Sequence, residues 1–142
     1  MSVKSKGPFD AQVFLASAGV SRKIVEYPLG TNIFKQGDPC DHVLYIQNGN
    51  VQMSVLSQSG REAVVAMLGA GEFFGEGCLA GQPVRMGTAK ATTDSTILLV
   101  DKRRMIALLH KQRGMSDRFI AHMLARNIQI ERNLIDQLFK LE

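Results

Sequence analysis

The chain has 142 residues, about the size of one domain and long enough to bury a self-sufficient core. Apolar residues make up 45% and charged residues 21%, no apolar run approaches the roughly 20 residues that cross a bilayer, and no signal peptide is recognisable. Two cysteines cannot form a disulfide framework, so we expect a cytoplasmic protein with reduced thiols and no membrane partner. The net charge of +4 allows an anionic partner but is not by itself typical of nucleic-acid binding.

The first part of the chain predicts a β-domain that follows a short helix over residues 10–19. From residue 23 to residue 100, short apolar runs alternate with turn residues at a spacing of about ten. Asn48-Gly49 predicts a hairpin, because both residues tolerate a positive φ. This pattern favours an antiparallel sandwich or barrel. The runs with the length and the Val and Ile content of strands are Lys23–Tyr27, His42–Ile46, Val51–Leu56, Glu62–Met67 and Ser95–Val100.

After residue 100 the apolar spacing becomes helical. Asp101 is a plausible N-cap of a helix that continues to Leu109, and Gly114 is expected to interrupt the chain. Ser116 can cap a second helix, from Asp117 to at least Phe139. This helix has two neighbouring apolar stripes. One stripe is enough for packing against its own domain, so we expect the helix to pair with a second subunit through the other. The stripes comprise Met123, Asn127, Ile130, Leu134 and Leu138, and beside them Ile120, Leu124, Ile128 and Ile135.

The stretch between the fourth and fifth predicted strands carries the chemistry. It contains a glycine-rich turn, an acidic residue that neither helical nor strand periodicity explains, and a lone arginine nine residues later. A cyclic phosphate is matched by a guanidinium with backbone N–H groups, and a ribose hydroxyl needs a carboxylate acceptor nearby. Gly75, Glu76, the turn over residues 77–80 and Arg85 provide these parts in one contiguous loop.

This stretch resembles the phosphate-binding cassette of the cyclic-nucleotide-binding domains, whose core reads Phe-Gly-Glu and then Arg-Ser/Thr-Ala. Residues 34–39 are similar to a turn between early strands of that family, and residues 44–51 to its Tyr-Ile-x-x-Gly-x-Val strand pair. The resemblance covers residues 23 to about 100. It implies a mainly β fold with flanking helices, a double-sheet antiparallel β jelly roll followed by a long C-terminal dimerisation helix.

Within that family, the helical part is similar to the bacterial transcription regulators of the catabolite-activator type. The resemblance implies a helical lead-in (1–22), a β-roll cyclic-nucleotide-binding domain with its trailing helix (23–112) and a dimerisation helix (116–142). Those regulators place a helix-turn-helix after the dimer helix. We therefore expect a homodimer that contacts DNA only through a domain beyond this chain.

The resemblance also implies a role for each residue of the cassette. Glu76 would accept a bond from the ribose 2′-hydroxyl, Arg85 would pair with the cyclic phosphate, and backbone N–H groups would complete the anion site. No other cofactor and no metal is implied. The predicted ligand-binding residues are Gly75, Glu76, Gly77, Cys78, Arg85 and Met86, with Val64, Val65, Asn127, Ile130 and Glu131 as weaker candidates for contacts with the base.

The cassette departs from the family pattern at three positions. Met86 and Gly87 stand where family members commonly have Ser or Thr and then Ala, and Gly77 replaces a commonly apolar residue. The missing hydroxyl removes a phosphate contact worth about 1.5–3 kcal/mol. Thr88 is not expected to provide the missing hydroxyl, because the Thr88 side chain faces the other side of its strand. Since that hydroxyl could also favour guanine, we expect cyclic AMP rather than cyclic GMP as the ligand.

Other functions fit the sequence less well. A degenerate cassette could serve as a dimerisation domain or sense another ligand, and Glu76 with Arg85 could be a surface ion pair. An enzyme is not expected, because the His and Glu cluster of the cupin metal sites and any nucleophile–base arrangement are missing. Arg85→Ala is expected to abolish nucleotide binding and to leave folding nearly intact.

Overall fold

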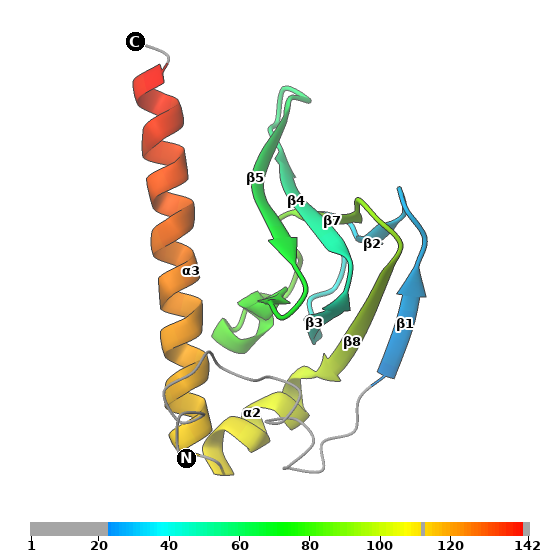
Figure 1. Ribbon diagram of the computed structural model, residues 1–142, viewed down its shortest axis with the longest axis vertical. Coiled ribbons are helices and arrows are strands. Elements are labelled where there is room, and N and C mark those ends of the chain that lie inside the picture. The colour runs from blue at the N-terminus through cyan, green and yellow to red at the C-terminus, as the bar shows by residue number, and fades with distance from the viewer. Residues whose placement is uncertain (1–22, 112, 141–142) are drawn as a thin grey trace. The chain divides into compact units, whose positions relative to one another are not determined.

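The structure, a computed structural model, describes residues 23–111 and 113–140. The expected lead-in over residues 1–22, with its short helix, lies outside the described residues. The chain divides into two compact units, one formed by Val20–Ile106 and one that includes Ala107–Glu142. The first unit holds every strand found among the described residues, and Figure 1 shows these strands in blue to yellow-green.

Two four-stranded antiparallel sheets form the first unit. One sheet has the order β1-β8-β3-β6 and the other the order β2-β7-β4-β5. This confirms the predicted mainly β architecture of two antiparallel sheets with helices. The strands are β1 (Lys23–Tyr27), β2 (Asn32–Phe34), β3 (His42–Asn48), β4 (Asn50–Leu56), β5 (Glu62–Gly69), β6 (Phe73–Phe74), β7 (Thr88–Ala91) and β8 (Ser95–Asp101).

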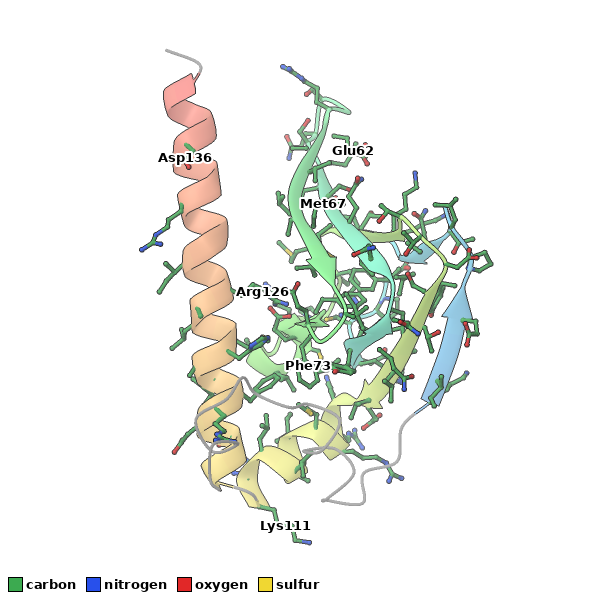
Figure 2. All side chains as sticks on the ribbon, viewed as in Figure 1. Glu62, Met67, Phe73, Lys111, Arg126 and Asp136 are labelled. Atoms are coloured by element: carbon green, nitrogen blue, oxygen red, sulfur yellow. The ribbon has the colours of Figure 1, made fainter. Side chains whose placement is uncertain are left out.

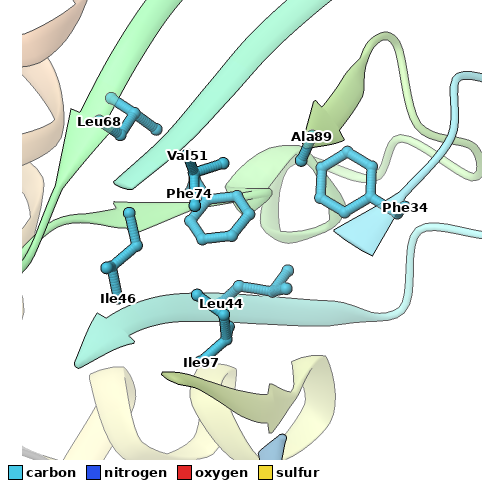
Figure 3. Close-up of a cluster of buried hydrophobic side chains, with 8 residues drawn as sticks. All are labelled: Phe34, Leu44, Ile46, Val51, Leu68, Phe74, Ala89 and Ile97. Carbon is cyan, nitrogen blue, oxygen red and sulfur yellow. The ribbon is translucent and has the colours of Figure 1, made fainter. Parts of the chain in front are cut away.

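The core lies between the inner faces of the two sheets, as Figure 3 shows. Every strand except β1 contributes one or two fully packed side chains to it. The Phe34 and Phe74 rings come from opposite sheets and stack with centroids 6.0 Å apart. Burial of a large apolar side chain of this kind contributes about 1.5–3 kcal/mol, so the cluster contributes substantially to stability. The cluster comprises Phe34, Leu44, Ile46, Val51, Leu68, Phe74, Ala89 and Ile97.

The predicted hairpin at Asn48-Gly49 is wrong. β3 and β4 lie in different sheets, so this turn passes the chain from one sheet to the other. Gly49 has a φ of 103°, and a Cβ there would lie 2.2 Å from the Ser95 Oγ, so the position requires glycine for reasons unrelated to a hairpin. The actual hairpin joins β4 to β5 through the turn around Gly60.

The five predicted strands are all present, and three short strands were missed. β2, β6 and β7 have three, two and four residues, too few to show a period of two. β7 places Ala89 and Ala91 in the core with no exposed area. The small alanine side chain allows close packing there, but alanine in the sequence does not indicate a strand. β2 pairs with β7, β6 with β3, and β7 also with β4, so each of the three short strands has its partners far away in the sequence.

Two helices follow the strands: α2 (Lys102–Lys111) and α3 (Arg113–Lys140). The predicted cap is confirmed, because the Asp101 carboxylate accepts the N–H groups of Arg103 and Arg104 at 2.9 and 3.3 Å. Ser116 is not a cap, since α3 already contains Gly114 and Ser116. One glycine costs a helix only about 1 kcal/mol, which a 28-residue helix can offset. Neither helix, over its described residues, is long and apolar enough to span a membrane.

Candidate ligand-binding site

The glycine-rich loop forms a tight turn and a short helix between β6 and β7. Gly75 has a φ of 71°, and the 3₁₀-helix η2 (Glu76–Ala80) follows it and ends at Gly81, which has a φ of 89°. A Cβ on Gly75 would lie 2.7 Å from the Arg85 Nη1 and 2.8 Å from the Leu44 Cδ1. The position therefore requires glycine twice, for its backbone conformation and for the close approach of Arg85.

The Arg85 side chain is the centre of the site. It is only 6% exposed, and its guanidinium donates to two backbone carbonyls, Nη1 to Gly75 O at 2.8 Å and Nη2 to His42 O at 2.9 Å. Nη1 also lies 3.2 Å from the Cys40 Sγ, and the Cζ lies 4.2 Å from the centroid of the Phe34 ring. The guanidinium thus joins the cassette to the start of β3 and to β2.

The backbone around Arg85 is held by the turn that precedes β3. The Arg85 N–H donates to Asp38 O at 2.7 Å, and its carbonyl accepts the Gly37 N–H at 2.8 Å. Cys40 N–H donates to Pro83 O at 2.9 Å in the same ladder. These bonds explain why the Gly37-Asp38 turn accompanies the cassette in the sequence: the turn fixes the backbone of the segment before β7, from which the Arg85 side chain projects.

Hydrogen-bond counting shows what Arg85 has left for a ligand. A guanidinium carries five N–H donors, and the three bonds above use three of them. Among the described residues, the buried Nε has no hydrogen-bond partner. An anion could therefore take the Nε–H and one Nη2–H together, but it must first uncover the Nε.

The other predicted ligand residues lie in or beside η2. Glu76 and Gly77 begin the helix and are partly buried, and Cys78 is buried. A Cβ on Gly77 would meet only the flexible end of Gln82, at 2.5 Å. Met86 is 63% exposed, and its side chain has no hydroxyl group to offer to a ligand. The structure therefore brings Gly75, Glu76, Gly77, Cys78, Arg85 and Met86 into one segment of the fold.

One departure from the family pattern, Gly87, has a packing reason, and the structure also shows what occupies the Thr88 hydroxyl. Gly87 is buried against β4, and a Cβ there would lie 2.7 Å from Ser54 O, so alanine does not fit at this position. The Thr88 hydroxyl accepts the Gln36 N–H at 2.9 Å. That bond holds Thr88 to the turn before β3, away from the role of a phosphate donor.

The thiol of Cys78 is held in its protonated form. Burial, and next the neighbouring Cys40, raise the pKa of Cys78 to about 11, against 9.0 for an ordinary thiol. Arg85 acts in the opposite direction and lowers it. The Cys78 Sγ lies 3.7 Å from Gly75 O, the same oxygen that accepts Arg85 Nη1. The environment therefore favours an uncharged thiol within hydrogen-bonding reach of the cassette.

The weaker candidates are less well defined. Val64 and Val65 lie on β5, where Met53 pairs with Ala66 and Ser54 with Val64, which makes Val65 the extra residue of a β-bulge. Val64 is 44% exposed and Val65 is partly buried. Figure 2 shows the side chains along β5, with Glu62 labelled at its start and Met67 further along the strand. The side chains of Asn127, Ile130 and Glu131 on α3 lie outside the described residues.

A cavity of about 250 Å³ adjoins Arg85 in the first unit. Arg85 is its only member among the predicted ligand residues, and the His42 ring at its wall bonds Asp41, with the Nδ1 and Oδ1 atoms 2.9 Å apart. The cavity has polar and apolar walls, so a small amphipathic molecule could enter. It is lined by Tyr27, Ile33, Phe34, Asp38, Pro39, Asp41, His42, Leu44, Arg85 and Leu99.

Three residues that surround Arg85 were not predicted as part of the site. Phe34, Cys40 and His42 come from β2 and the start of β3, more than 40 positions before Arg85. In two of these contacts Arg85 meets a backbone carbonyl and the face of an aromatic ring, and no sequence motif indicates such contacts. Only the turn motif at residues 34–39 indicated this neighbourhood, and without the fold it did not indicate which atoms meet Arg85.

A double-sheet β-domain with a glycine-rich loop, a short helix and a buried arginine defines a class of small-molecule sensor domains. The family model described as the cyclic nucleotide-binding domain matches residues 24–112. The chain belongs to the cyclic nucleotide-binding domain family.

Individual relatives agree with this assignment. The cyclic AMP receptor protein of Thermus thermophilus is 30% identical over 118 residues, which are 83% of this chain and 53% of the relative. The crystal structure of the Thermus thermophilus catabolite activator protein matches 93% of this chain and 60% of that chain, with a TM-score of 0.73 and 27% identity. The c-di-GMP responsive global regulator CLP of Xanthomonas campestris matches 93% and 61%, with a TM-score of 0.71 and 25% identity. The chain thus spans about half the length of the curated relatives it matches.

Proposed function

We propose that this chain is a small-molecule sensor domain that binds a cyclic nucleotide in the cassette, with cyclic AMP favoured over cyclic GMP. The observation that carries the proposal is the single loop that presents Gly75, Glu76 and Arg85 around one helix start. The named relatives are regulators, and one of them is a cyclic AMP receptor protein, which supports a sensor rather than an enzyme. The proposed ligand would be held without a metal or another cofactor.

In this proposal each residue has one task. The Glu76 carboxylate accepts a bond from the ribose 2′-hydroxyl, and Arg85 offers its Nε–H and remaining Nη2–H to the cyclic phosphate. Backbone N–H groups at Gly77, Cys78 and Met86 complete the anion site. Val64 and Val65 on β5, with Asn127, Ile130 and Glu131 on α3, would contact the base. Preference for adenine follows from Met86, which offers no hydroxyl to a guanine.

A different ligand is the second candidate, and two observations favour it. Arg85 already has three protein acceptors, and the family hydroxyl is replaced by Met86. One similar solved structure is that of a regulator responsive to c-di-GMP, a larger cyclic nucleotide with two phosphates. The competing proposal is therefore a cassette that no longer takes a mononucleotide, and that senses another ligand or serves only as a dimerisation domain.

We further propose that α3 pairs two subunits and passes the signal to a DNA-binding domain beyond this chain. Three apolar side chains spaced four residues apart on α3 are exposed: Ile120 at 52%, Leu124 at 56% and Ile128 at 49%. A continuous exposed stripe of this kind is typical of a helix that packs against a partner helix. The ligand must bind one arrangement of the dimer better than the other, because tight binding alone shifts no equilibrium.

The test is a calorimetric titration of the chain with cyclic AMP, cyclic GMP and c-di-GMP in parallel. We expect saturable binding of cyclic AMP at micromolar concentration or below, and weaker binding of cyclic GMP. Glu76→Gln keeps the size of the side chain but removes its charge, so it should weaken cyclic AMP binding about tenfold or more. Tight binding of c-di-GMP alone would favour the second candidate. No heat with any of the three up to millimolar concentration would contradict a nucleotide sensor.

A further inference from the structure

The only two cysteines of the chain lie in one cluster, although 37 residues separate them in the sequence. Arg85 Nη1 donates to the Cys40 Sγ at 3.2 Å and to Gly75 O at 2.8 Å. The Cys78 thiol donates to the same Gly75 O at 3.7 Å, so both sulfurs belong to one hydrogen-bonded cluster. The two sulfurs are therefore linked through Gly75 O and the guanidinium of Arg85.

The elements that carry the two sulfurs are packed together. Cys40 lies two residues before β3, Cys78 lies in η2, and β3 and η2 are in contact. Both cysteines are buried, at 4% and 3% exposure, and both are free thiols. A large oxidant cannot reach them, whereas a small uncharged one can enter through ordinary local opening. Nothing in the cyclic-nucleotide assignment uses either sulfur.

We propose that Cys40 and Cys78 form a redox site, a dithiol that a hydroperoxide converts into an intramolecular disulfide. The bond would tie the loop before β3 to the helix of the cassette. The site is independent of nucleotide binding, since neither sulfur needs a ligand to react.

The two sulfurs differ in their surroundings, and this difference assigns their order of reaction. Thiolates react with peroxides, and Cys40 is the sulfur that accepts a bond from the guanidinium of Arg85. Burial and Cys40 raise the pKa of Cys78, so Cys78 keeps its proton until the second step. We therefore assign Cys40 as the attacking sulfur and Cys78 as the resolving sulfur.

The chemistry balances with hydrogen peroxide as the oxidant. The Cys40 thiolate attacks one peroxide oxygen, the O–O bond breaks, and Cys40 becomes a sulfenic acid while the leaving hydroxide takes a proton to form water. The Cys78 sulfur then attacks the Cys40 sulfur, the S–S bond forms and the S–O bond breaks. The departing hydroxide takes the Cys78 proton and leaves as a second water. Two thiols lose two electrons, and the peroxide gains them.

The experiment treats the folded chain with hydrogen peroxide, alkylates the remaining thiols, and measures the intact mass without reductant. We expect a mass loss of about 2 Da, no alkylation, and a linked peptide pair that contains Cys40 and Cys78. Non-reducing electrophoresis should show no covalent dimer. Dimedone, which traps sulfenic acids, should label Cys40 in the Cys78→Ser variant and should leave Cys78 unlabelled in the Cys40→Ser variant.

Other outcomes would overturn the proposal. Two alkylated thiols after peroxide treatment, or only intermolecular disulfides, would show that the cluster does not act as a dithiol. Formation of the disulfide in urea but not in the folded chain would show the same. Dimedone on Cys78 instead of Cys40 would overturn the assigned order. The peptide map of the unsubstituted chain decides the main point even if a serine variant fails to fold.

Discussion

The guanidinium Nη1 of Arg85 donates a 2.8 Å hydrogen bond to the carbonyl oxygen of Gly75, ten residues earlier. This bond closes the cassette, because it joins the residue that starts η2 to the residue that leads into β7. Arg85 therefore stabilises the cassette loop, whereas the sequence indicated only a contact between Arg85 and the ligand. The same side chain is therefore committed to the fold and, in our proposal, to the ligand.

Gly75 is predicted to be irreplaceable because of this contact. Gly75→Ala adds a Cβ at a φ of 71°, 2.7 Å from Arg85 Nη1, and should lower the free energy of unfolding by about 2–4 kcal/mol. Gly71→Ala is the matched control: it has a φ of 92° but no atom within 4 Å, so it should cost only about 1–2 kcal/mol. Urea unfolding of both variants measures the difference. Equal losses would show that the Arg85 contact carries no packing cost.

Arg85→Ala is predicted to destabilise the fold, against the expectation from the sequence. The substitution removes the donors to Gly75 O and His42 O and the cation above the Phe34 ring. Loss of these bonds in a buried site should cost about 3 kcal/mol. Lys90→Ala, at an exposed position of β7, should change stability by less than about 0.5 kcal/mol. Thermal unfolding compares the two, and an Arg85→Ala variant as stable as Lys90→Ala would contradict the structural role.

Met86→Ser is predicted to strengthen nucleotide binding. Met86 is 63% exposed, so its replacement should hardly affect folding, and the new hydroxyl can donate to the phosphate. One added bond to a charged group should tighten cyclic AMP binding about tenfold. Val84→Ser is the control, since Val84 is 41% exposed and lies on the other side of Arg85 in the chain. Calorimetry that finds the same affinity in both variants would argue against a phosphate beside residue 86.

The stability of the reduced chain is predicted to fall between about pH 9 and pH 11 because of Cys78. The unfolded chain releases this proton at the ordinary pKa of 9.0, whereas the folded chain holds it until about 11. Folding is thus favoured below pH 9, and the advantage, roughly 2–3 kcal/mol, is lost as the pH rises through 11. Cys78→Ala should show a shallower decline in urea unfolding with reductant present. Parallel pH profiles for the two proteins would contradict the raised pKa.

Leu124→Glu is predicted to weaken self-association. Leu124 lies at the centre of the exposed stripe on α3, so a charge there should raise the dissociation constant of a helix-mediated dimer at least tenfold. Ala125→Glu, about 100° around the helix, is the control and should have a small effect. Sedimentation velocity measures both. A chain that stays monomeric at all concentrations, or variants that associate equally, would contradict pairing through this stripe.

Features that depend on near neighbours in the chain could be predicted from the amino-acid sequence alone. The Val- and Ile-rich runs became β1, β3, β4, β5 and β8, and the Asp101 cap formed as expected, because both follow from local periodicity and hydrogen bonding. The cassette was recognisable for the same reason, since Gly75, Glu76 and Arg85 lie within eleven consecutive residues. The helix start at Arg113 was missed because a single glycine is too weak a signal to end a helix.

Which groups meet across long stretches of chain became visible only in the folded protein. The turn at Gly49 changes sheets instead of closing a hairpin, because the pairing of β3 with β8 and of β4 with β5 is fixed by the shared core. The same packing brings Phe34, Cys40 and the His42 carbonyl to Arg85 and places Cys40 and Cys78 in one hydrogen-bonded cluster. These contacts depend on non-local burial and on backbone atoms, and neither leaves a pattern in the sequence.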